Sequence, residues 1–144
     1  MTIPFEILLI EDNEGDVEMT RRAFRDIQPA CNLSVVNDGA EALDFLNKQK
    51  NFDGAPTPSL MLLDLNMPRM GGLEFLENVK TDAALKVVPV VMFTSSQSPG
   101  DIRNCYDHHA SAYVVKPFSG KEFTKALQDI VHFWTSLGQL PQVV

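Results

Sequence analysis

The stretch Ser59-Leu-Met-Leu-Leu-Asp64-Leu-Asn-Met-Pro68 decides the fold. Its apolar run, Leu60 to Leu63, is too short for a helix and lacks the polar alternation of a half-exposed strand. Such a run is typical of a strand that is buried on both faces of a parallel sheet. The strand ends at Asp64, and Asn66-Met67-Pro68 then turns the chain into a loop. Because ligands bind outside the carboxyl ends of the strands in open α/β sheets, Asp64 is the first candidate functional residue.

Strand and helix patterns alternate along the rest of the chain. Apolar runs predict strands at residues 5–10, 33–36, 60–63, 87–93 and 112–115. Apolar spacing, capping residues and glycines predict helices in 16–27, from 38, from 71–72, in 98–109 and from 119. This alternation implies a parallel sheet with right-handed crossovers and helices on both faces. We therefore predict one domain with a doubly wound α/β fold of five strands and five helices.

Composition excludes several classes of protein. The 144 residues carry a net charge of −7, and no basic run is present, which argues against nucleic acid as a partner. The N-terminus lacks the pattern of a signal peptide, and no apolar run approaches the roughly 18 residues that span a bilayer. We therefore expect a cytoplasmic protein without a membrane partner. Cys31 and Cys105 match no metal or redox spacing and are interpreted as inert thiols.

Chemically useful side chains follow four of the predicted strands. These residues are Glu11 and Asp12, Asp64, Thr94, and Lys116. In one parallel sheet they can converge on a single cleft. Two carboxylates about 4 Å apart repel by about 4 kcal/mol at an effective dielectric constant of about 20, so cations are needed there. Lys116 supplies one positive charge, and Mg²⁺ bound by Asp12, Asp64, a loop carbonyl and waters would supply two more.

A carboxylate beside Mg²⁺ is a plausible phosphoryl acceptor, because enzymes form aspartyl-phosphate intermediates. Thr94 could donate its hydroxyl to one phosphoryl oxygen, and Lys116 could pair with another. Each residue alone also has a simpler interpretation: a solvated acidic turn, a turn former, a helix cap or a surface charge. The coincidence of all of them at strand ends favours a site.

The chain resembles the receiver domain of two-component response regulators over about residues 5 to 135. The resemblance rests on Ile10-Glu11-Asp12, Asp64-Leu-Asn-Met-Pro68, Gly71-Gly72, Thr94-Ser95, Tyr113 and Lys116-Pro117-Phe118. It implies the flavodoxin-like strand order 2-1-3-4-5. It also implies that Asp64 is phosphorylated by a sensor histidine kinase or a phosphotransfer protein.

The resemblance further implies a role for each residue of the site. Asp12, Asp64 and the carbonyl of Asn66 would hold Mg²⁺, with Glu11 acting through water. Thr94 would be the switch hydroxyl, Tyr113 the aromatic residue that turns inward on activation, and Lys116 the cation that pairs with the phosphate. The Lys116-Pro117 peptide bond is expected to be cis, as is usual in the family.

Two departures from a minimal receiver resemble single-domain regulators that serve bacterial phytochrome kinases. One is the long loop from Asn47 to Pro58, and the other is the apolar extension 137–144 that follows the receiver domain at 1–136. An output domain is not expected. We predict a homodimer, formed either through the C-terminal extension or through the face of the fourth helix, fifth strand and fifth helix.

The favoured function is a phospho-accepting switch whose only expected activities are self-phosphorylation and self-dephosphorylation. One alternative is an adaptor that works without phosphorylation. Another is an Mg²⁺-dependent phosphohydrolase with an Asp nucleophile, but such enzymes usually carry a second Asp where this chain has Asn66. A flavodoxin-like cofactor binder is disfavoured because the acidic turn from Glu11 to Asp16 would repel a phosphate.

Overall fold

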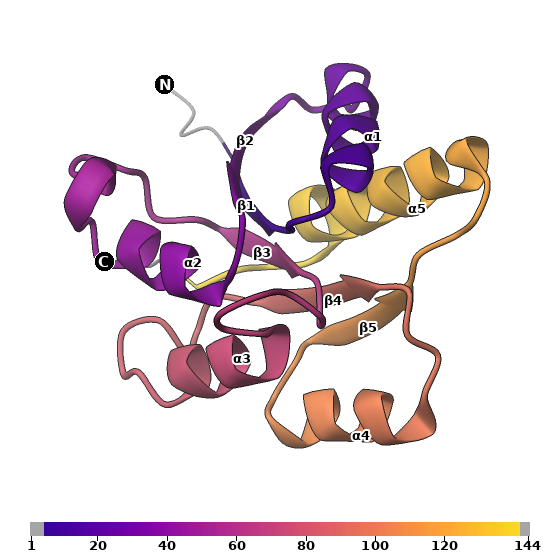
Figure 1. The fold of residues 1–144 in the computed structure, drawn as a ribbon. Helices are drawn as coiled ribbons and strands as arrows, with labels where there is room; N and C mark the ends of the chain where they lie inside the picture. Colours follow the sequence, from indigo (N-terminus) through magenta and orange to yellow (C-terminus); the bar gives the residue numbers. More distant parts are fainter. Residues whose placement is uncertain (1–4, 142–144) are drawn as a thin grey trace.

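A five-stranded parallel sheet forms the centre of the molecule (Figure 1). The computed structural model describes residues 5–141. The strands are β1 (Phe5–Ile10), β2 (Cys31–Val36), β3 (Leu60–Leu63), β4 (Val90–Thr94) and β5 (Ala112–Val115). They lie in the order β2-β1-β3-β4-β5, and each neighbouring pair is parallel. The predicted doubly wound fold and its strand order are confirmed.

The helices follow the strands in alternation. They are α1 (Glu14–Arg25), α2 (Gly39–Leu46), α3 (Gly72–Lys80), α4 (Pro99–Asp107) and α5 (Gly120–His132). A short 3₁₀ turn, η1 (Lys50–Phe52), lies in the predicted loop, and a π-helical turn, η2 (Phe133–Leu137), continues α5. Asp38, Ser98 and Ser119 cap α2, α4 and α5 as predicted, because each side chain accepts a backbone N–H three residues later.

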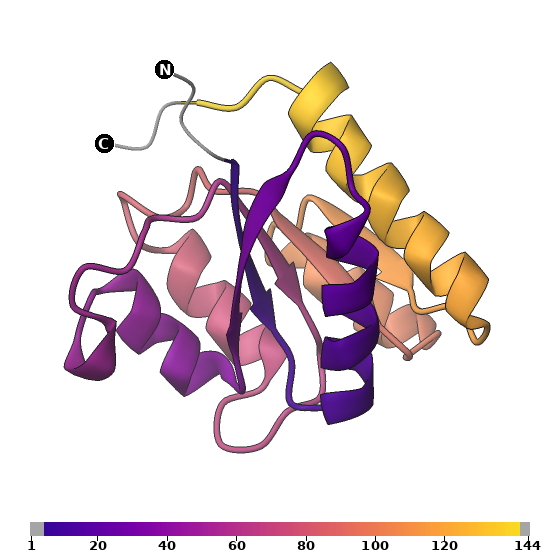
Figure 2. The ribbon, with the colours of Figure 1, turned by 90° about the horizontal axis from the view of Figure 1, so that it is seen from above.

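Helices cover both faces of the sheet (Figure 2), and the strand side chains divide between the two buried layers beneath them. Successive residues of a strand point to opposite faces, so Leu8 and Ile10 pack with α2 and α3, whereas Ile7 and Leu9 pack with α1 and α5. The four residues of β3 are all fully buried, as a strand covered on both faces requires. The central position of β3 therefore fixes where the chain emerges at Asp64.

Some predicted boundaries are wrong by a few residues. The fourth strand begins at Val90 rather than Val87, because Val88 donates its N–H to Leu85 in a turn and Val87 is 42% exposed. Helix α1 ends at Arg25, although Ile27 still reaches the core. Within residues 5–141, no helix combines the length and the apolar character that a membrane crossing needs.

Candidate functional site

The candidate site is a hollow of about 470 Å³ at the carboxyl ends of the strands. Its lining residues come from four strand ends and the start of α1: Asp12, Asn13, Asp16, Asp64, Asn66, Thr94, Ser95 and Lys116. The convergence predicted for Asp12, Asp64, Thr94 and Lys116 is therefore present in the structure. The hollow is strongly acidic, with Lys116 as the single basic residue of its lining.

The sheet ladders set these positions, because hydrogen bonding continues one residue past several strands. Glu11 donates its N–H to Val36 at 3.0 Å, Asp64 donates to Ile10 at 3.0 Å, and Lys116 donates to Thr94 at 2.8 Å. Each of these backbone positions is consequently fixed by a neighbouring strand. The side chains that follow the strands meet at one edge of the sheet.

Three carboxylates cluster in this region. Glu11, Asp12 and Asp64 each offer an oxygen atom, and these oxygens lie within 4.8 Å of one another. Glu11 is buried, Asp64 is partly buried and Asp12 is exposed, so solvent can reach the cluster from one side. Mutual repulsion at such distances requires compensation by protons or cations.

The environment of Glu11 favours binding of a cation or a proton at the cluster. Its Oε2 is buried and has no hydrogen-bond partner among the described residues. Burial, together with the nearby Asp64 carboxyl group, raises the pKa of Glu11 to about 9, despite the opposing effect of Lys116. An orphaned buried oxygen beside two further carboxylates is a donor set that suits a hard divalent cation. The residues present therefore fit the metal predicted from the sequence.

Lys116 crosses the hollow to reach the acidic groups. Its Nζ pairs with Glu11 Oε1, lies 2.7 Å from Asp16 Oδ2, and lies 3.9 Å from Asp64 Oδ1. Burial alone would lower the pKa of Lys116, but the hydrogen bonds to Asp16 and Glu11 outweigh it and raise the pKa overall. Lys116 is therefore a charged ammonium group whose nearest partners are not the predicted acceptor. The expected cis bond before Pro117 is wrong for this structure, where the bond is trans.

Asp16 is the charged residue of the hollow that sequence reasoning missed, and Asn13, which caps α1, was missed with it. The first turn of α1 places it there, because the Asn13 side chain caps the helix by accepting the Asp16 N–H at 2.9 Å. In the sequence it is indistinguishable from an ordinary first-turn acidic residue such as Glu14. Only the three-dimensional contact with Lys116 separates the two.

Thr94 and Tyr113 occupy different places. Thr94 lines the same hollow as Asp12 and Asp64 and is only 1% exposed. Tyr113 is absent from the lining and instead donates its hydroxyl to the Ser96 carbonyl at 2.9 Å. Burial raises the pKa of Tyr113, which keeps the phenol protonated as a donor. The loop from Thr94 to Ser96 thus connects the hollow to the aromatic ring on β5.

The loop after Asp64 is held by several contacts. Gly72 donates its N–H to Leu65 at 2.8 Å, and Gly39 donates to the Met70 carbonyl at 3.0 Å. Arg69 pairs with the buried carboxylate of Asp38, with Nη2 2.5 Å from Oδ2. Asn66 lies between these anchors in the sequence and lines the hollow.

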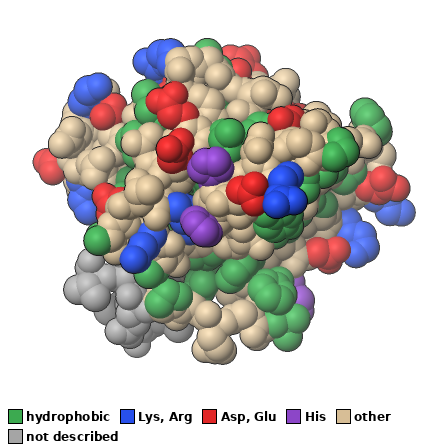
Figure 3. All heavy atoms as spheres, turned by 90° about the horizontal axis from the view of Figure 1, so that it is seen from below, with side chains coloured by type: hydrophobic (Ala, Val, Ile, Leu, Met, Phe, Trp, Pro, Cys, Tyr) green, Lys and Arg blue, Asp and Glu red, His purple; other side chains and the backbone are tan. Residues whose placement is uncertain are grey.

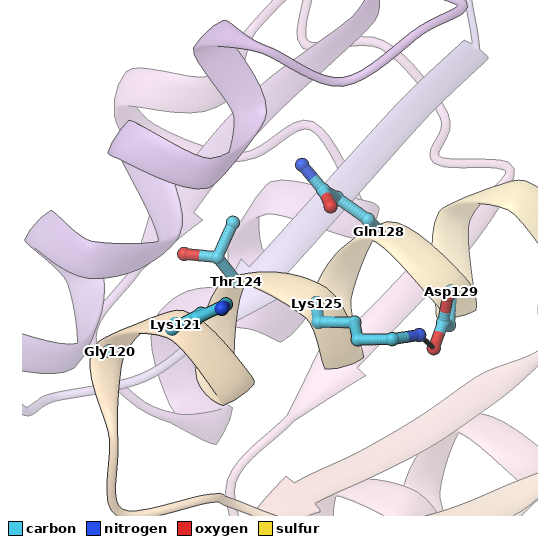
Figure 4. Close-up of a pocket in the computed structure, with 6 residues that line it drawn as sticks. All are labelled: Gly120, Lys121, Thr124, Lys125, Gln128 and Asp129. Atoms are coloured by element: carbon cyan, nitrogen blue, oxygen red, sulfur yellow. Dashed lines mark hydrogen bonds and ion pairs between the residues drawn. The ribbon is translucent and has the colours of Figure 1, made fainter.

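A larger hollow of about 650 Å³ lies on the outer face of α5 (Figure 4). All its lining residues come from that one helix, and the figure shows Lys125 paired with Asp129, at 2.9 Å. It gathers no buried polar group and no residue that follows a strand. Its chemistry is that of an exposed helix face, and we place the functional site at the acidic hollow instead.

Comparison with known proteins agrees with this placement. Residues 7–128 match the family model described as the response regulator receiver domain. The response regulator Rcp1 of Synechocystis sp. is 34% identical over 138 residues, which cover 96% of this chain and 94% of Rcp1. A structure of Rcp1 has been solved in a Mn²⁺-bound form, with a TM-score of 0.90 to this chain over 96% of it and all of that chain.

Another related structure is that of the phosphorylated cyanobacterial phytochrome response regulator RcpA. It is 33% identical, with a TM-score of 0.93, and the match covers 97% of this chain and 100% of that chain. The bacteriophytochrome response regulator AtBRR is 41% identical, with a TM-score of 0.76 over 96% of this chain and 100% of that chain. The family match spans most of the chain, and the relatives match it almost end to end. The chain therefore belongs to the response regulator receiver family, whose members are phospho-accepting switches of two-component signalling.

Proposed function

We propose that Asp64 is the residue that accepts the phosphoryl group from a sensor histidine kinase or a phosphotransfer protein. The observation that carries the proposal is the position of Asp64, which shares one hollow with a carboxylate cluster and with the ammonium group of Lys116. An Asp64 oxygen would attack the phosphorus atom, and the bond from phosphorus to the donor would break. The electron pair of that bond would leave with the donor.

The cation of this site is proposed to be Mg²⁺. Asp12, Asp64 and the Asn66 carbonyl would hold it together with water, and Glu11 would contact it through water. Glu11 Oε2, which has no hydrogen-bond partner within residues 5–141, and the all-oxygen donor set support this assignment. When bound, such an ion offsets negative charge on the phosphoryl oxygens.

The other residues are proposed to detect the phosphoryl group. Lys116 is close enough to turn from its present partners toward an oxygen attached to Asp64. Thr94 would donate its buried hydroxyl to a phosphoryl oxygen, which would draw the loop from Thr94 to Ser96 toward the hollow. Because Tyr113 donates to the Ser96 carbonyl, that movement would be passed to β5 and α4.

A phytochrome-type kinase is the proposed phosphoryl donor, and the cytoplasm is the proposed compartment. The support for the donor is that the similar structures of RcpA and AtBRR are described as phytochrome and bacteriophytochrome response regulators. We also propose that the chain acts as a switch and catalyses nothing beyond its own phosphorylation and dephosphorylation.

A second copy of this chain is the proposed partner for the region after α5. Phe133 is 47% exposed and Leu137 is 67% exposed, whereas Trp134 packs partly against the core beneath α5. Two exposed apolar side chains on consecutive turns favour burial against another surface. We place the end of the receiver domain after residue 136 and the extension at 137–144, of which 142–144 lie outside the described residues.

The face of α4, β5 and α5 remains the alternative dimer surface. Figure 3, which views the molecule from the side of α3 and α4, shows acidic, basic and histidine side chains interspersed with small apolar groups. Such a mixed surface resembles an ordinary solvated face more than the apolar centre of a stable dimer. We favour the extension because its exposed apolar side chains, Phe133 and Leu137, lie on consecutive turns.

The test is incubation of the purified chain with acetyl phosphate and Mg²⁺, followed by intact mass and size-exclusion chromatography. We expect one phosphoryl adduct that is lost in Asp64→Asn, while the mutant keeps its circular dichroism spectrum. A change in elution volume that depends on the adduct would make dimerisation the output. An adduct that persists in Asp64→Asn would refute the acceptor, and no adduct on a folded chain would favour the phosphorylation-independent adaptor.

A further inference from the structure

Asp16 makes a contact with Lys116 that the proposed phosphoryl chemistry does not use. Its Oδ2 lies 2.7 Å from Lys116 Nζ, whereas the nearest oxygen of Asp64 lies 3.9 Å away. The side chain of Lys116 is 8% exposed, and that of Asp16 is 23% exposed, so water screens this pair only partly. In the resting geometry, Asp16 is therefore a stronger partner of Lys116 than Asp64 is.

Asp16 is also held firmly in place. Its N–H is bonded to the Asn13 side chain at 2.9 Å, and its carbonyl accepts the Thr20 hydroxyl at 2.8 Å. It belongs to the first turn of a twelve-residue helix whose later turns are anchored by Ala23 and Phe24 in the core. The carboxylate can therefore not follow Lys116 far when the ammonium group turns toward another partner.

The charge of Asp16 matters for what the hollow can accept. Its side chain lines the same hollow as Asp12 and Asp64, so it adds a further negative charge next to the acceptor. A dianionic phosphoryl group on Asp64 would be repelled by this charge, and it would compete with Asp16 for the ammonium group. Both effects act in the same direction, against the phosphorylated state.

We propose that Asp16 is a positioning residue that retains Lys116 on the α1 side of the hollow and thereby limits phosphorylation of Asp64. The inference rests on the proposed function, because it concerns how readily that same site takes up a phosphoryl group. Asp16 touches neither the acceptor nor the donor and acts through Lys116. Its replacement by a neutral residue is expected to make phosphorylation easier.

The test compares Asp16→Asn with a matched control, Glu14→Gln. Both variants remove one negative charge from the first turn of α1, but Glu14 is exposed and does not line the hollow. Asparagine keeps nearly the same shape as aspartate. A general effect of net charge would therefore appear in both variants, whereas an effect through Lys116 would appear only in Asp16→Asn.

Two quantities are measured at fixed Mg²⁺ concentration. One is the rate at which subsaturating acetyl phosphate produces the adduct, and the other is the affinity for beryllofluoride, which mimics a phosphoryl group on a carboxylate without covalent turnover. We expect Asp16→Asn to increase both by about threefold to tenfold, the range for loss of a partly screened charged hydrogen bond. Asp16→Glu, which keeps the charge, should remain closer to the unaltered chain, and urea unfolding verifies that each variant is folded.

The outcomes separate this inference from the proposed function. Equal rates and affinities in Asp16→Asn and Glu14→Gln would overturn the role of Asp16 while leaving Asp64 as the acceptor. A decrease in Asp16→Asn would also overturn it, because it would mean that Asp16 helps Lys116 to reach the phosphoryl group. No Asp64-dependent adduct in the unaltered chain would overturn the proposed function itself.

Discussion

Among the described glycines, Gly72 leaves the least room for a Cβ atom, and its replacement by alanine tests how rigidly Asp64 must be held. An added Cβ would meet the carbonyl oxygen of Asp64 far inside van der Waals distance, and it would lie only 2.9 Å from Leu65 Cα. All these neighbours are backbone atoms, so no side chain can rotate away. The start of α3 and the strand end at Asp64 must therefore separate by more than the roughly 0.5 Å within which catalytic groups are held.

The expected cost appears in two measurements. Strain from an added methyl group in a packed interior costs about 1–3 kcal/mol, so the urea midpoint should fall while the slope of the transition stays the same. Phosphorylation by acetyl phosphate should slow by roughly tenfold to a hundredfold, because displacements of this order misplace a reacting group.

The matched control for this experiment is Gly120→Ala. Gly120 opens α5 as Gly72 opens α3, but a Cβ there would meet no atom within 4 Å. Its stability should change by about 0.5 kcal/mol or less. A Gly72→Ala chain that is destabilised but phosphorylated at the normal rate would refute the reasoning, because the acceptor would then not depend on its distance from α3.

Two further predictions concern buried groups away from the acceptor. Arg69→Gln should lower the free energy of unfolding by about 1–2 kcal/mol, because the 2%-exposed carboxylate of Asp38 keeps only the Glu41 N–H as a described partner. The side chain of Arg69 is 66% exposed, so the cost stays below that of breaking a fully buried ion pair. Asp38→Asn preserves the helix cap and removes the charge that Arg69 pairs with. Urea unfolding of the two single variants and the double variant should show that the double variant loses less stability than the sum of the single losses. Additive losses would mean that the ion pair contributes nothing to stability. Burial of the Cys105 thiol, with a smaller effect of Asp101, raises its pKa from 9.0 to about 11. The unfolded chain therefore loses this proton first as the pH rises. The stability that the protonated thiol contributes, at most about 3 kcal/mol, is present below pH 9 and is lost between pH 9 and 11. Between pH 9 and 11, the urea midpoint of Cys105→Ala should fall less than that of the unaltered chain. If the midpoints of the two proteins fall in parallel, the pH dependence does not come from Cys105.

The sequence is sufficient for those parts of the fold that depend on local patterns. An uninterrupted apolar run such as Leu60–Leu63 has few alternatives to a central parallel strand, and Ser119 with Glu122 marks a helix start. The strand ends Asp64 and Lys116 follow from the same patterns, so their convergence could be predicted. Val87 and Val88 look like strand residues, but the turn before Pro89 removes them from β4.

The contacts missed by the sequence are those between segments distant along the chain. Asp16 and Lys116 are one hundred residues apart, and nothing in either segment distinguishes the pair from exposed charges. The same is true of Arg69, which has a left-handed backbone with φ of 62° and reaches Asp38 across thirty-one residues. Periodicity reports burial, whereas the pairing of charges depends on how the loops are arranged around the sheet.

The two sides of the hollow are held by different kinds of contact. On the β3 side, Asp64 and the following loop are held by the close approach of Gly72, by the Gly39 hydrogen bond and by the Arg69 ion pair, all of which are independent of phosphate. On the β5 side, Lys116 is held by carboxylates with which a phosphoryl group would compete. A new charge on Asp64 would therefore perturb the second side more than the first. The proposed acceptor is fixed by packing, and we expect the response to be concentrated where charged partners can be exchanged.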